Sequence, residues 1–422
     1  MLLQFSVQNF RSIKERVTLD MQALDGRSIK EHKDSLIAGN TLPVVAIYGP
    51  NGGGKTTLLL AFRAMQFFVT KMFENYGGGQ LSQVPPNLCI PFWFDNESKN
   101  KPTCFEVVIE LQNIQYKYGF DVFNNVIKKE YLYKREKNSE IELLYERIEQ
   151  KVSIPCKNIS GTITENMASK VSQDMPLLVF INQFYNESPI KDIVQWFLDS
   201  RFIDYNDVNQ EGLLLNIIIE QNENKEFKKE ILKILKAFDI KVFDYEIRKI
   251  DQNINLPHGN FKQRQIEFKT IHKIGDKEIS LSFQWESMGT KKIVGLVPFI
   301  ISSLKVGFAF FIDELDSKLH PKLLEQIIGL YTNPDINTGG GQLIFTSHDM
   351  TTMNSKIFRR DEIYFMALTD EQDSELYSLI EIKEDDGKVT RKDGNIAKRY
   401  LEGRYGADPY FEKISNWGQS NV

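Results

Sequence analysis

One glycine-rich octapeptide has the composition of a phosphate-binding loop. Its sequence, Gly49-Pro50-Asn51-Gly52-Gly53-Gly54-Lys55-Thr56, fits the pattern GxxxxGK[ST]. The glycines allow successive backbone N–H groups to turn inward around phosphate oxygens. Lys55 would place a point charge on the β- and γ-phosphates, and Thr56 would supply a hydroxyl ligand for Mg²⁺. We therefore predict Mg-ATP binding by Gly49, Asn51, Gly52, Gly53, Gly54, Lys55, Thr56 and Thr57.

A pair of acids follows an apolar run in the second half of the chain. Residues 308–312 indicate a buried strand, and Asp313 and Glu314 come directly after it. Carboxylates at the end of a buried strand are costly to desolvate without a partner, and a bound Mg²⁺ would remove that cost. We predict that Asp313 holds the metal through water and that Glu314 is the catalytic general base. The alternative is an ordinary helix cap, because an apolar strand followed by Asp is common.

A histidine follows another apolar segment. Residues 343–345 indicate a strand next to the acidic one, and Thr346-Ser347-His348-Asp349 comes after it. A histidine there can reach the γ-phosphate, so we predict a catalytic switch role for His348, although a lone histidine is more often structural. The other histidines show no metal-ligand spacing. They are His32, His258, His272 and His320.

The elements that must position these residues alternate between strand and helix patterns. Residues 42–48 form a continuous apolar run with β-branched side chains, which indicates a strand covered on both faces. The octapeptide follows, and residues 55–73 have helical periodicity until the glycines at 77–79. This context favours a phosphate loop over a chance glycine-rich turn. Further strands are predicted at 2–7, 17–21, 105–111, 116–123, 130–134, 242–250, 264–273, 278–284 and 362–366, and further helices at 190–197, 227–238, after Gly289 and from Pro321 on.

The chain divides into three parts by pattern. Residues 1–139 and 241–422 carry the strand patterns and the candidate site residues, which predicts two lobes of one α/β unit. Residues 140–240 are polar and mainly helical in pattern, which indicates an insertion between the lobes. The heptads of this stretch are too broken, and the stretch is too short, for a long coiled-coil arm.

Composition excludes several classes of protein. The 422 residues are 41% hydrophobic and 26% charged, which is typical of globular chains. The net charge of −5 disfavours wrapping of nucleic acid by this chain alone, while a local basic groove or a basic partner is left open. The cysteines, Cys89, Cys104 and Cys156, lie far apart and form no CxxC, which suits a reducing compartment.

Targeting and membrane segments are not expected. Residues 1–13 alternate like a strand, unlike a secretory signal. Residues 293–312 are long and apolar enough to suggest a membrane span, but Pro298 and Gly307 interrupt them and Asp313 follows at once. We predict a buried helix, a turn and a buried strand there, in a soluble cytoplasmic protein.

Taken together, these motifs resemble the ATPase heads of the ABC/SMC type. The resemblance rests on the phosphate loop, on Asp313-Glu314-Leu315-Asp316-Ser317 and on Thr346-Ser347-His348-Asp349. The finer match is to the OLD-like bacterial ATPases, particularly the RloA/AbiLi group, to which stretches 7–12, 286–290, 319–321 and 399–409 are also similar. The implied fold is an α/β P-loop NTPase, an ABC-type ATPase head with a two-lobed sheet core and a mainly helical insertion.

The resemblance implies a composite site at a homodimer interface. Two heads would sandwich two ATP molecules with their Mg²⁺. Ser287 and Gly289, in the signature motif of one chain, would cap the γ-phosphate held by Lys55 of the other. Asp316 would lie in the D-loop along the dimer seam. Arg11 would approach the nucleotide, with a plain surface arginine as the alternative.

The sequence departs from the family pattern at three points. The signature is ESMGT at 286–290 instead of the LSGGQ of transporters. No glutamine is assigned to the Q-loop, although Gln80 and Gln83 lie in suitable territory. Many OLD-like proteins carry a C-terminal TOPRIM nuclease, but no acidic DxD follows His348. We therefore expect an ATPase subunit without its own nuclease.

The resemblance favours one cellular function and leaves an alternative. The first is an ATPase subunit of a bacterial anti-phage, abortive-infection-like system, a nucleotide-gated dimer that controls a separate effector such as a nuclease or toxin. The alternative is a RecF-like DNA-repair ATPase that clamps duplex DNA, against which the net charge argues mildly. A transporter subunit fits poorly because the insertion and ESMGT disagree with it, and a non-enzymatic binding module would require no turnover despite Glu314. No membrane partner is expected; nucleic acid and a larger assembly are left open.

Overall fold

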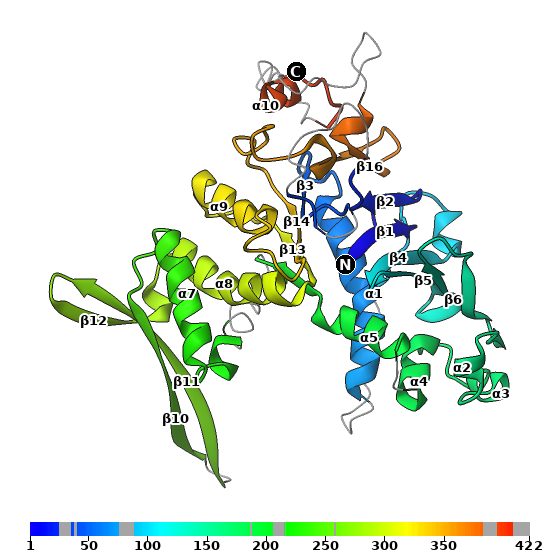
Figure 1. Ribbon diagram of the computed structural model, residues 1–422, viewed down its shortest axis with the longest axis horizontal. Helices are drawn as coiled ribbons and strands as arrows, with labels where there is room; N and C mark the ends of the chain where they lie inside the picture. Colours follow the sequence, from blue (N-terminus) through cyan, green and yellow to red (C-terminus); the bar gives the residue numbers. More distant parts are fainter. Residues whose placement is uncertain are drawn as a thin grey trace, which may run out of the picture.

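Two sheets and a long helix between them make up most of the molecule (Figure 1). The computed structural model describes residues 1–24, 35–37, 40–75, 88–185, 188–205, 215, 217–256, 259–382 and 395–407. A third, narrow sheet projects from one side of the body. Among the described residues, no helix is both long and apolar enough to cross a membrane.

A six-stranded sheet forms the centre, in the order β16-β15-β3-β14-β13-β9. All neighbouring strands are parallel except β16, which pairs antiparallel with β15 at one edge. The carboxyl ends of β3, β14 and β13 therefore meet at one edge of the sheet, which is where ligands bind in open α/β sheets. The strands are β3 (Val44–Tyr48), β9 (Arg201–Asp204), β13 (Ala309–Asp313), β14 (Gln342–Thr346), β15 (Ile363–Leu368) and β16 (Ser374–Ser378).

Alternate side chains of the central sheet enter two separate hydrophobic cores. In β3, Val45 and Ile47 belong to one core, while Val44 and Ala46 belong to the other. This alternation follows from the two-residue period of a strand, and it requires helices on both faces. The first face is covered by α1 (Lys55–Asn75), and the second by α8 (Met288–Val306) and α9 (Pro321–Thr332).

The first core lies between the central sheet and a second, seven-stranded antiparallel sheet, ordered β2-β1-β4-β5-β6-β7-β8. Helix α1 runs between the two sheets (Figure 1). Its Phe62 stacks on Phe311 of β13, with ring centroids 3.9 Å apart, and meets Phe5 of β1 edge-on at 5.5 Å. The strands are β1 (Leu2–Gln8), β2 (Val17–Asp20), β4 (Thr103–Leu111), β5 (Ile114–Phe123), β6 (Val126–Glu136), β7 (Glu142–Ile148) and β8 (Lys151–Ser153).

The remaining elements surround these sheets. Short helices follow β8 and lie beside the lower half of α1, which α4 and α5 contact (Figure 1). Helix α7 lies beside α8 at the base of the projecting sheet β10-β11-β12. Helix α10 lies near the end of the described chain. The bounds are α2 (Lys157–Ser160), α3 (Glu165–Ala168), α4 (Leu177–Phe184), α5 (Ile190–Asp199), α7 (Lys225–Ala237), β10 (Asp244–Leu256), β11 (Gly259–Ile274), β12 (Lys277–Ser282) and α10 (Ile396–Leu401).

Most predicted elements are present, but the prediction of helical structure from residue 140 on is wrong at its beginning. There β7 and β8 extend the antiparallel sheet, with Leu144 and Tyr145 buried. The charged residues around this pair hide the strand pattern. Within the same range, β9 pairs with β13 as an edge of the central sheet. The glycines at 77–79, predicted to end the first helix, lie outside the described residues, as do His32 and His258.

The apolar stretch before Asp313 was predicted to be interrupted at Pro298 and at Gly307, but the structure interrupts it only at Gly307. Pro298 lies inside α8 without ending it, and only Gly307 breaks the stretch, at the helix C-cap with φ 86°. A proline forbids one helical hydrogen bond, but the surrounding residues of α8 are almost all buried, so tertiary packing holds the helix together. The predicted succession of buried helix, turn and buried strand is confirmed.

A buried carboxylate fastens the helices after β8 to the antiparallel sheet. Glu130 of β6 has no exposed surface and accepts the backbone N–H groups of Leu177 and Leu178, at 2.6 and 2.9 Å, in the first turn of α4. It also accepts the hydroxyls of Tyr118 and Tyr145, each at 3.1 Å. Burial raises the pKa of Glu130, and these hydrogen bonds oppose that rise. A carboxylate at the N-terminus of a helix accepts hydrogen bonds from the free backbone N–H groups of the first turn, and its negative charge interacts favourably with the helix dipole.

Replacing this carboxylate should destabilise the fold. Glu130→Ala leaves buried donors without an acceptor, so we expect the free energy of unfolding to fall by about 3 kcal/mol. Chemical denaturation of the full chain measures it. Glu142→Ala, at the exposed start of β7, should stay within about 0.5 kcal/mol of the parent. Equal stability of the two variants would contradict the anchoring role.

Candidate functional site

The predicted phosphate loop lies between β3 and α1, at the carboxyl edge of the central sheet. Gly49 and Gly53 both face the backbone carbonyl of Met366 in β15. A Cβ atom would lie 2.0 Å from that oxygen at Gly49 and 2.7 Å from it at Gly53. At Gly54, φ is 100° and a Cβ would lie 2.3 Å from the Ser374 hydroxyl. The glycines therefore let the loop close against β15 and β16. Within the loop, the N–H of Gly53 donates to the Pro50 carbonyl at 3.1 Å.

Lys55 is the buried cation of this loop, only 6% exposed. Its Nζ donates to the carbonyls of Gly49 and Pro50, both at 2.9 Å. Burial lowers the pKa of Lys55, and the nearby charges of Asp313 and Glu314 counteract this. An ammonium has three donors, so these two bonds leave a third for a phosphate oxygen.

A hydrogen bond joins the end of the phosphate loop to the acidic strand. The hydroxyl of Thr56 donates to Asp313 Oδ2 at 2.8 Å, and the hydroxyl of Thr346 donates to Asp313 Oδ1 at 2.6 Å. Asp313 is 1% exposed. Its two oxygens are thus held by hydroxyls from the first turn of α1 and from the end of β14. A hydroxyl and a carboxylate in contact are oxygen ligands of the kind Mg²⁺ prefers, so these residues fit the predicted metal.

In the part of the chain that the structure describes, this pair has no competing cluster of metal ligands. Among the described residues, no group of three or more His, Cys, Asp or Glu side chains could hold a metal ion. Mg²⁺ is usually bound through one or two protein ligands together with phosphates and water. The pair Thr56 and Asp313 suits that kind of coordination, and the metal role of both residues remains a prediction.

Glu314, the predicted general base, is partly exposed and has an unusual backbone. Its φ is 49°, in the left-handed region that costs non-glycine residues energy. Its N–H donates to Thr346 Oγ1 at 2.7 Å, and its carbonyl accepts from Lys292 Nζ at 2.8 Å. The residue is therefore fixed by contacts on both of its peptide groups, while its side chain keeps access to solvent.

Asp316 and His348, predicted from separate motifs, meet in the structure. The backbone N–H of His348 donates to Asp316 Oδ2 at 3.1 Å, and the histidine side chain is exposed. Asp316 Oδ1 is buried and has no hydrogen-bond partner among the described residues. The loops after β13 and β14 thus lie against each other beside the phosphate loop. The catalytic role of His348 and the D-loop role of Asp316 remain predictions.

The N-terminal turn packs against the other side of the phosphate loop. The Ser12 hydroxyl donates to Thr57 Oγ1 at 3.3 Å and accepts from Ser374 Oγ at 2.8 Å. Thr57 therefore contacts this turn, and its predicted contact with the nucleotide is untested. Arg11 is partly buried, has φ 53°, and places its guanidinium over Phe10 at 5.6 Å. Its Nε is buried without a hydrogen-bond partner among the described residues.

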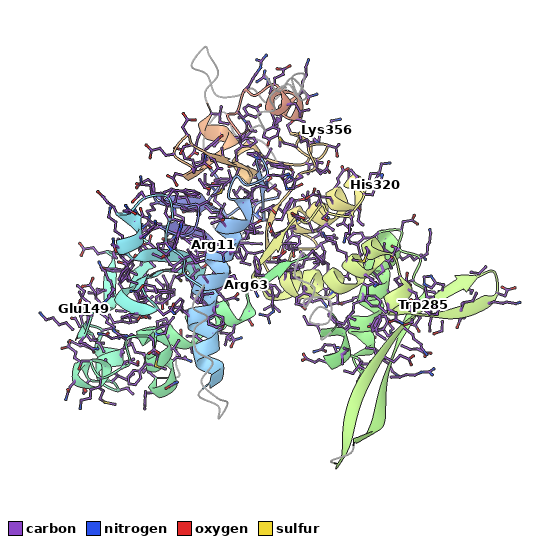
Figure 2. All side chains as sticks on the ribbon, turned by 180° about the vertical axis from the view of Figure 1, so that it is seen from behind. Arg11, Arg63, Glu149, Trp285, His320 and Lys356 are labelled. Carbon is purple, nitrogen blue, oxygen red and sulfur yellow. The ribbon has the colours of Figure 1, made fainter. Side chains whose placement is uncertain are left out.

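The predicted signature residues lie apart from this loop. Ser287 is exposed and caps α8, accepting the N–H of Thr290 at 3.1 Å. Figure 2 shows Trp285, two residues before it, beside the projecting sheet and well separated from Arg11. Gly289 instead approaches the loop after β13, where a Cβ would lie 3.0 Å from the Lys318 carbonyl. Gln80 and Gln83, considered for the Q-loop, lie outside the described residues.

Sequence reasoning missed several residues that shape the site. Thr346 stands in the quoted TSHD stretch, and its hydroxyl bonds both Asp313 and Glu314. A hydroxyl residue directly before the predicted switch was the available signal. Lys292 follows the signature by two positions, and only its place in an apolar helix marks it. The carbonyl of Met366 carries no sequence signal, because its role depends on backbone position alone.

Comparisons with known proteins place the chain among nucleotide-binding domains. The family model described as "AAA domain, putative AbiEii toxin, Type IV TA system" matches residues 44–151 and 188–354. Similar solved structures include the SMC head domain from Thermotoga maritima, with 14% identity, 89% of this chain and 98% of that chain covered, and a TM-score of 0.40. Another is the Smc head domain with a coiled coil and joint derived from Pyrococcus yayanosii, with 10% identity, coverages of 96% and 99%, and a TM-score of 0.41. No curated protein matches the chain.

The loop geometry predicts a binding defect on loss of the buried ammonium. Lys55→Ala should weaken ATP affinity by about 3 kcal/mol, roughly a hundredfold, because the phosphates lose their positive partner. Titration with a fluorescent ATP analogue measures this. Lys322→Ala, which removes an exposed lysine from α9, should bind like the parent. A Lys55→Ala protein that remains folded and keeps parental affinity would exclude this loop as the phosphate site.

Proposed function

Because the chain belongs to the family described as "AAA domain, putative AbiEii toxin, Type IV TA system", we propose that it binds Mg-ATP at Gly49–Thr56 and hydrolyses it. The predicted fold class is confirmed: the chain has the α/β fold of P-loop NTPases, with the phosphate loop between β3 and α1. Its domain is an ATPase domain of the AAA type.

The hydrogen bond between Thr56 and Asp313 carries this proposal. At 2.8 Å it joins the last residue of the phosphate loop to a carboxylate from a strand more than 250 residues further along the chain. Glu314 follows Asp313 directly, so a candidate base lies next to the candidate metal ligand. The alternative for Asp313 and Glu314 was an ordinary helix cap. A cap would not require Asp313 to accept a hydrogen bond from the phosphate loop.

The chain's own residues suit phosphoryl transfer by positioning and charge. The loop N–H groups and the N-terminus of α1 would hold the polyphosphate, and Lys55 would neutralise part of its charge. Mg²⁺, held by Thr56 and Asp313, would supply Lewis acidity toward the phosphate oxygens. Glu314 would accept a proton from the attacking water, and its partly exposed side chain leaves room for that water. The exposed side chain of His348 would contact the γ-phosphate.

A second copy of the chain would complete the site. Ser287 is exposed at the N-terminus of α8, and the amide groups of such a helix end can bind an anion. Such an end would cap the γ-phosphate held by Lys55 of a partner, with Gly289 giving the backbone close access and Asp316 at the seam. The exposed position of Ser287 supports this ABC/SMC-type homodimer.

At the level of the cell, we assign the ATPase to a bacterial anti-phage system of the abortive-infection kind. The family description names a toxin of a toxin–antitoxin system, and the sequence resembles the OLD-like RloA/AbiLi group. Its ATP-gated dimer would control a separate effector, such as a nuclease or toxin.

Removing the base should separate ATP binding from turnover. Glu314→Gln keeps the shape of the side chain but cannot accept the proton, so we expect kcat to fall about 10²–10⁴-fold with ATP affinity retained. Phosphate release measures turnover, and size-exclusion chromatography with light scattering should show an ATP-dependent dimer. Glu325→Gln, on exposed α9 surface, serves as the control. Parental turnover in Glu314→Gln would disqualify this carboxylate as the base.

The cellular role has its own test. The parent chain, Lys55→Ala and Glu314→Gln are each expressed with and without the adjacent gene of their operon, and phage plating and host growth are scored. We expect protection only with the adjacent gene and the parent chain. Protection by the chain alone, or protection that survives Lys55→Ala, would overturn the effector-control proposal without touching ATP hydrolysis.

A further inference from the structure

One buried lysine contacts the backbone of the candidate site and has no role in the proposed chemistry. Lys292 lies in the first turns of α8 and is 4% exposed, on a helix whose other buried residues are almost all apolar. Its Nζ donates to the carbonyl of Glu314 at 2.8 Å and to the carbonyl of Ser317 at 3.0 Å. The face of the Tyr205 ring covers it, with Nζ 4.1 Å from the centroid. The ammonium is therefore fully engaged by the two ends of one short loop and by an aromatic ring.

This lysine acts on the backbone of the predicted base. Glu314 has φ 49°, a conformation that persists only when its surroundings hold it. Thr346 Oγ1 accepts its N–H at 2.7 Å, and Lys292 donates to its carbonyl. Both peptide groups of Glu314 are thus tied down, one by β14 and one by α8. The direction in which the carboxylate points depends on these two contacts.

The same lysine controls the loop that contains Asp316. The Ser317 carbonyl accepts its second hydrogen bond, and Gly289 packs close to the carbonyl of Lys318, which also has a positive φ of 61°. The first turns of α8 and the loop after β13 are therefore joined at two neighbouring points. Ser287, the N-cap of α8, is therefore connected to Asp316 and Glu314 through contacts within one chain.

Burial makes a lysine costly at this position. Burial of the ammonium lowers the pKa of Lys292 to about 7, even though the carboxylates of Asp316 and Glu314 favour its charged form. Its hydrogen bonds to the carbonyls of Glu314 and Ser317 offset this cost, and an apolar residue in its place would leave both carbonyls without their donor. A surface pair on the same helix shows the contrast: Lys305 meets Glu230 of α7 at 2.6 Å with more than half of its side chain exposed.

We propose that Lys292 is a positioning residue that ties the signature helix to the catalytic loop of its own chain, setting the backbone of Glu314 for hydrolysis. The inference rests on the proposed ATPase function and deepens it. When a partner's γ-phosphate engages Ser287, the shift of α8 reaches Glu314 through Lys292, so each site senses occupancy of the other.

Turnover and nucleotide binding are measured first for Lys292→Met, Lys292→Arg and the control Lys305→Met. Methionine keeps an unbranched side chain of similar length but leaves the carbonyls of Glu314 and Ser317 without their donor. We expect kcat to fall about a hundredfold in Lys292→Met with ATP affinity within about twofold of the parent, and partial recovery in Lys292→Arg. Parental kcat in a folded Lys292→Met would overturn the proposal, and an inactive parent chain would instead contradict the proposed ATPase function.

Mixed dimers show on which chain the lysine acts. Mixed with Lys55→Ala, the Lys292→Met chain supplies the only intact phosphate loop, and that loop works with its own impaired Glu314, so we expect no recovery of turnover. A Ser287→Ala chain mixed with Lys55→Ala pairs an intact phosphate loop with an intact signature, and we expect turnover to recover. Recovery in the Lys292→Met mixture would show that the lysine serves the partner's site, and would overturn positioning within one chain.

Amide hydrogen exchange tests whether Lys292 holds the loop after β13 against α8, and this measurement does not require ATP hydrolysis. In the full chain without nucleotide, amides of residues 313–319 should exchange about tenfold faster in Lys292→Met than in the parent or in Lys305→Met, because the loop loses its anchor to α8. Amides of β3 should be unchanged and report an intact fold. Unchanged exchange at 313–319 would mean that Lys292 does not hold the loop.

Discussion

The buried carboxylate of Asp313 imposes the arrangement on which the site depends. A carboxylate that is 1% exposed must have both oxygens satisfied, and here hydroxyls from the first turn of α1 and the end of β14 do so. Thr56 and Thr346 can both reach it because β14 lies between β3 and β13, so the carboxyl ends of the three strands lie side by side. The contact thus depends on the order of the central sheet and on the position of the first turn of α1. A bound metal would replace the Thr56 proton as the partner of the carboxylate, which makes this hydrogen bond the natural marker of the site.

The shape of the phosphate loop is also constrained by the backbone of β15, which lies in close contact with the loop glycines. The Met366 carbonyl leaves no space for side chains at Gly49 and Gly53, and Ser374 fills the space beside Gly54. Ser374 is itself held by the N-terminal turn, through its N–H to the Ser12 carbonyl and through its hydroxyl to Ser12 Oγ, both at 2.8 Å. The loop is therefore shaped by β15, β16 and the N-terminal turn before any ligand binds. This preorganisation lowers the conformational cost of enclosing a triphosphate.

The parts of this protein that sequence predicts are those encoded within a short segment. The strand, loop and helix around Lys55 are contiguous, and the apolar strand before Asp313 is continuous and buried on both faces, so their patterns are unambiguous. The failures come from interactions between distant segments. β7 was missed because charged and apolar residues share its buried positions, with Arg147 as buried as Leu144 and Tyr145. Lys292 was missed because its partners are carbonyl groups, whose identity no side chain reveals. The separation of Ser287 from the phosphate loop likewise depends on how α8 crosses the central sheet.

The region predicted as the signature, residues 286–290, is held by contacts on both sides. On one side, Glu286 accepts a hydrogen bond from the Thr270 hydroxyl at 2.5 Å and contacts His272 Nε2 at 2.6 Å, both on β11, which fastens the residue before Ser287 to the projecting sheet. On the other side, Lys292 fastens α8 to the loop after β13. Glu286 and Lys292 therefore hold the segment between them at both of its ends, one to β11 and the other to the loop after β13. The exposed Ser287 lies between these two attachment points in the chain, so the position of its hydroxyl depends on both.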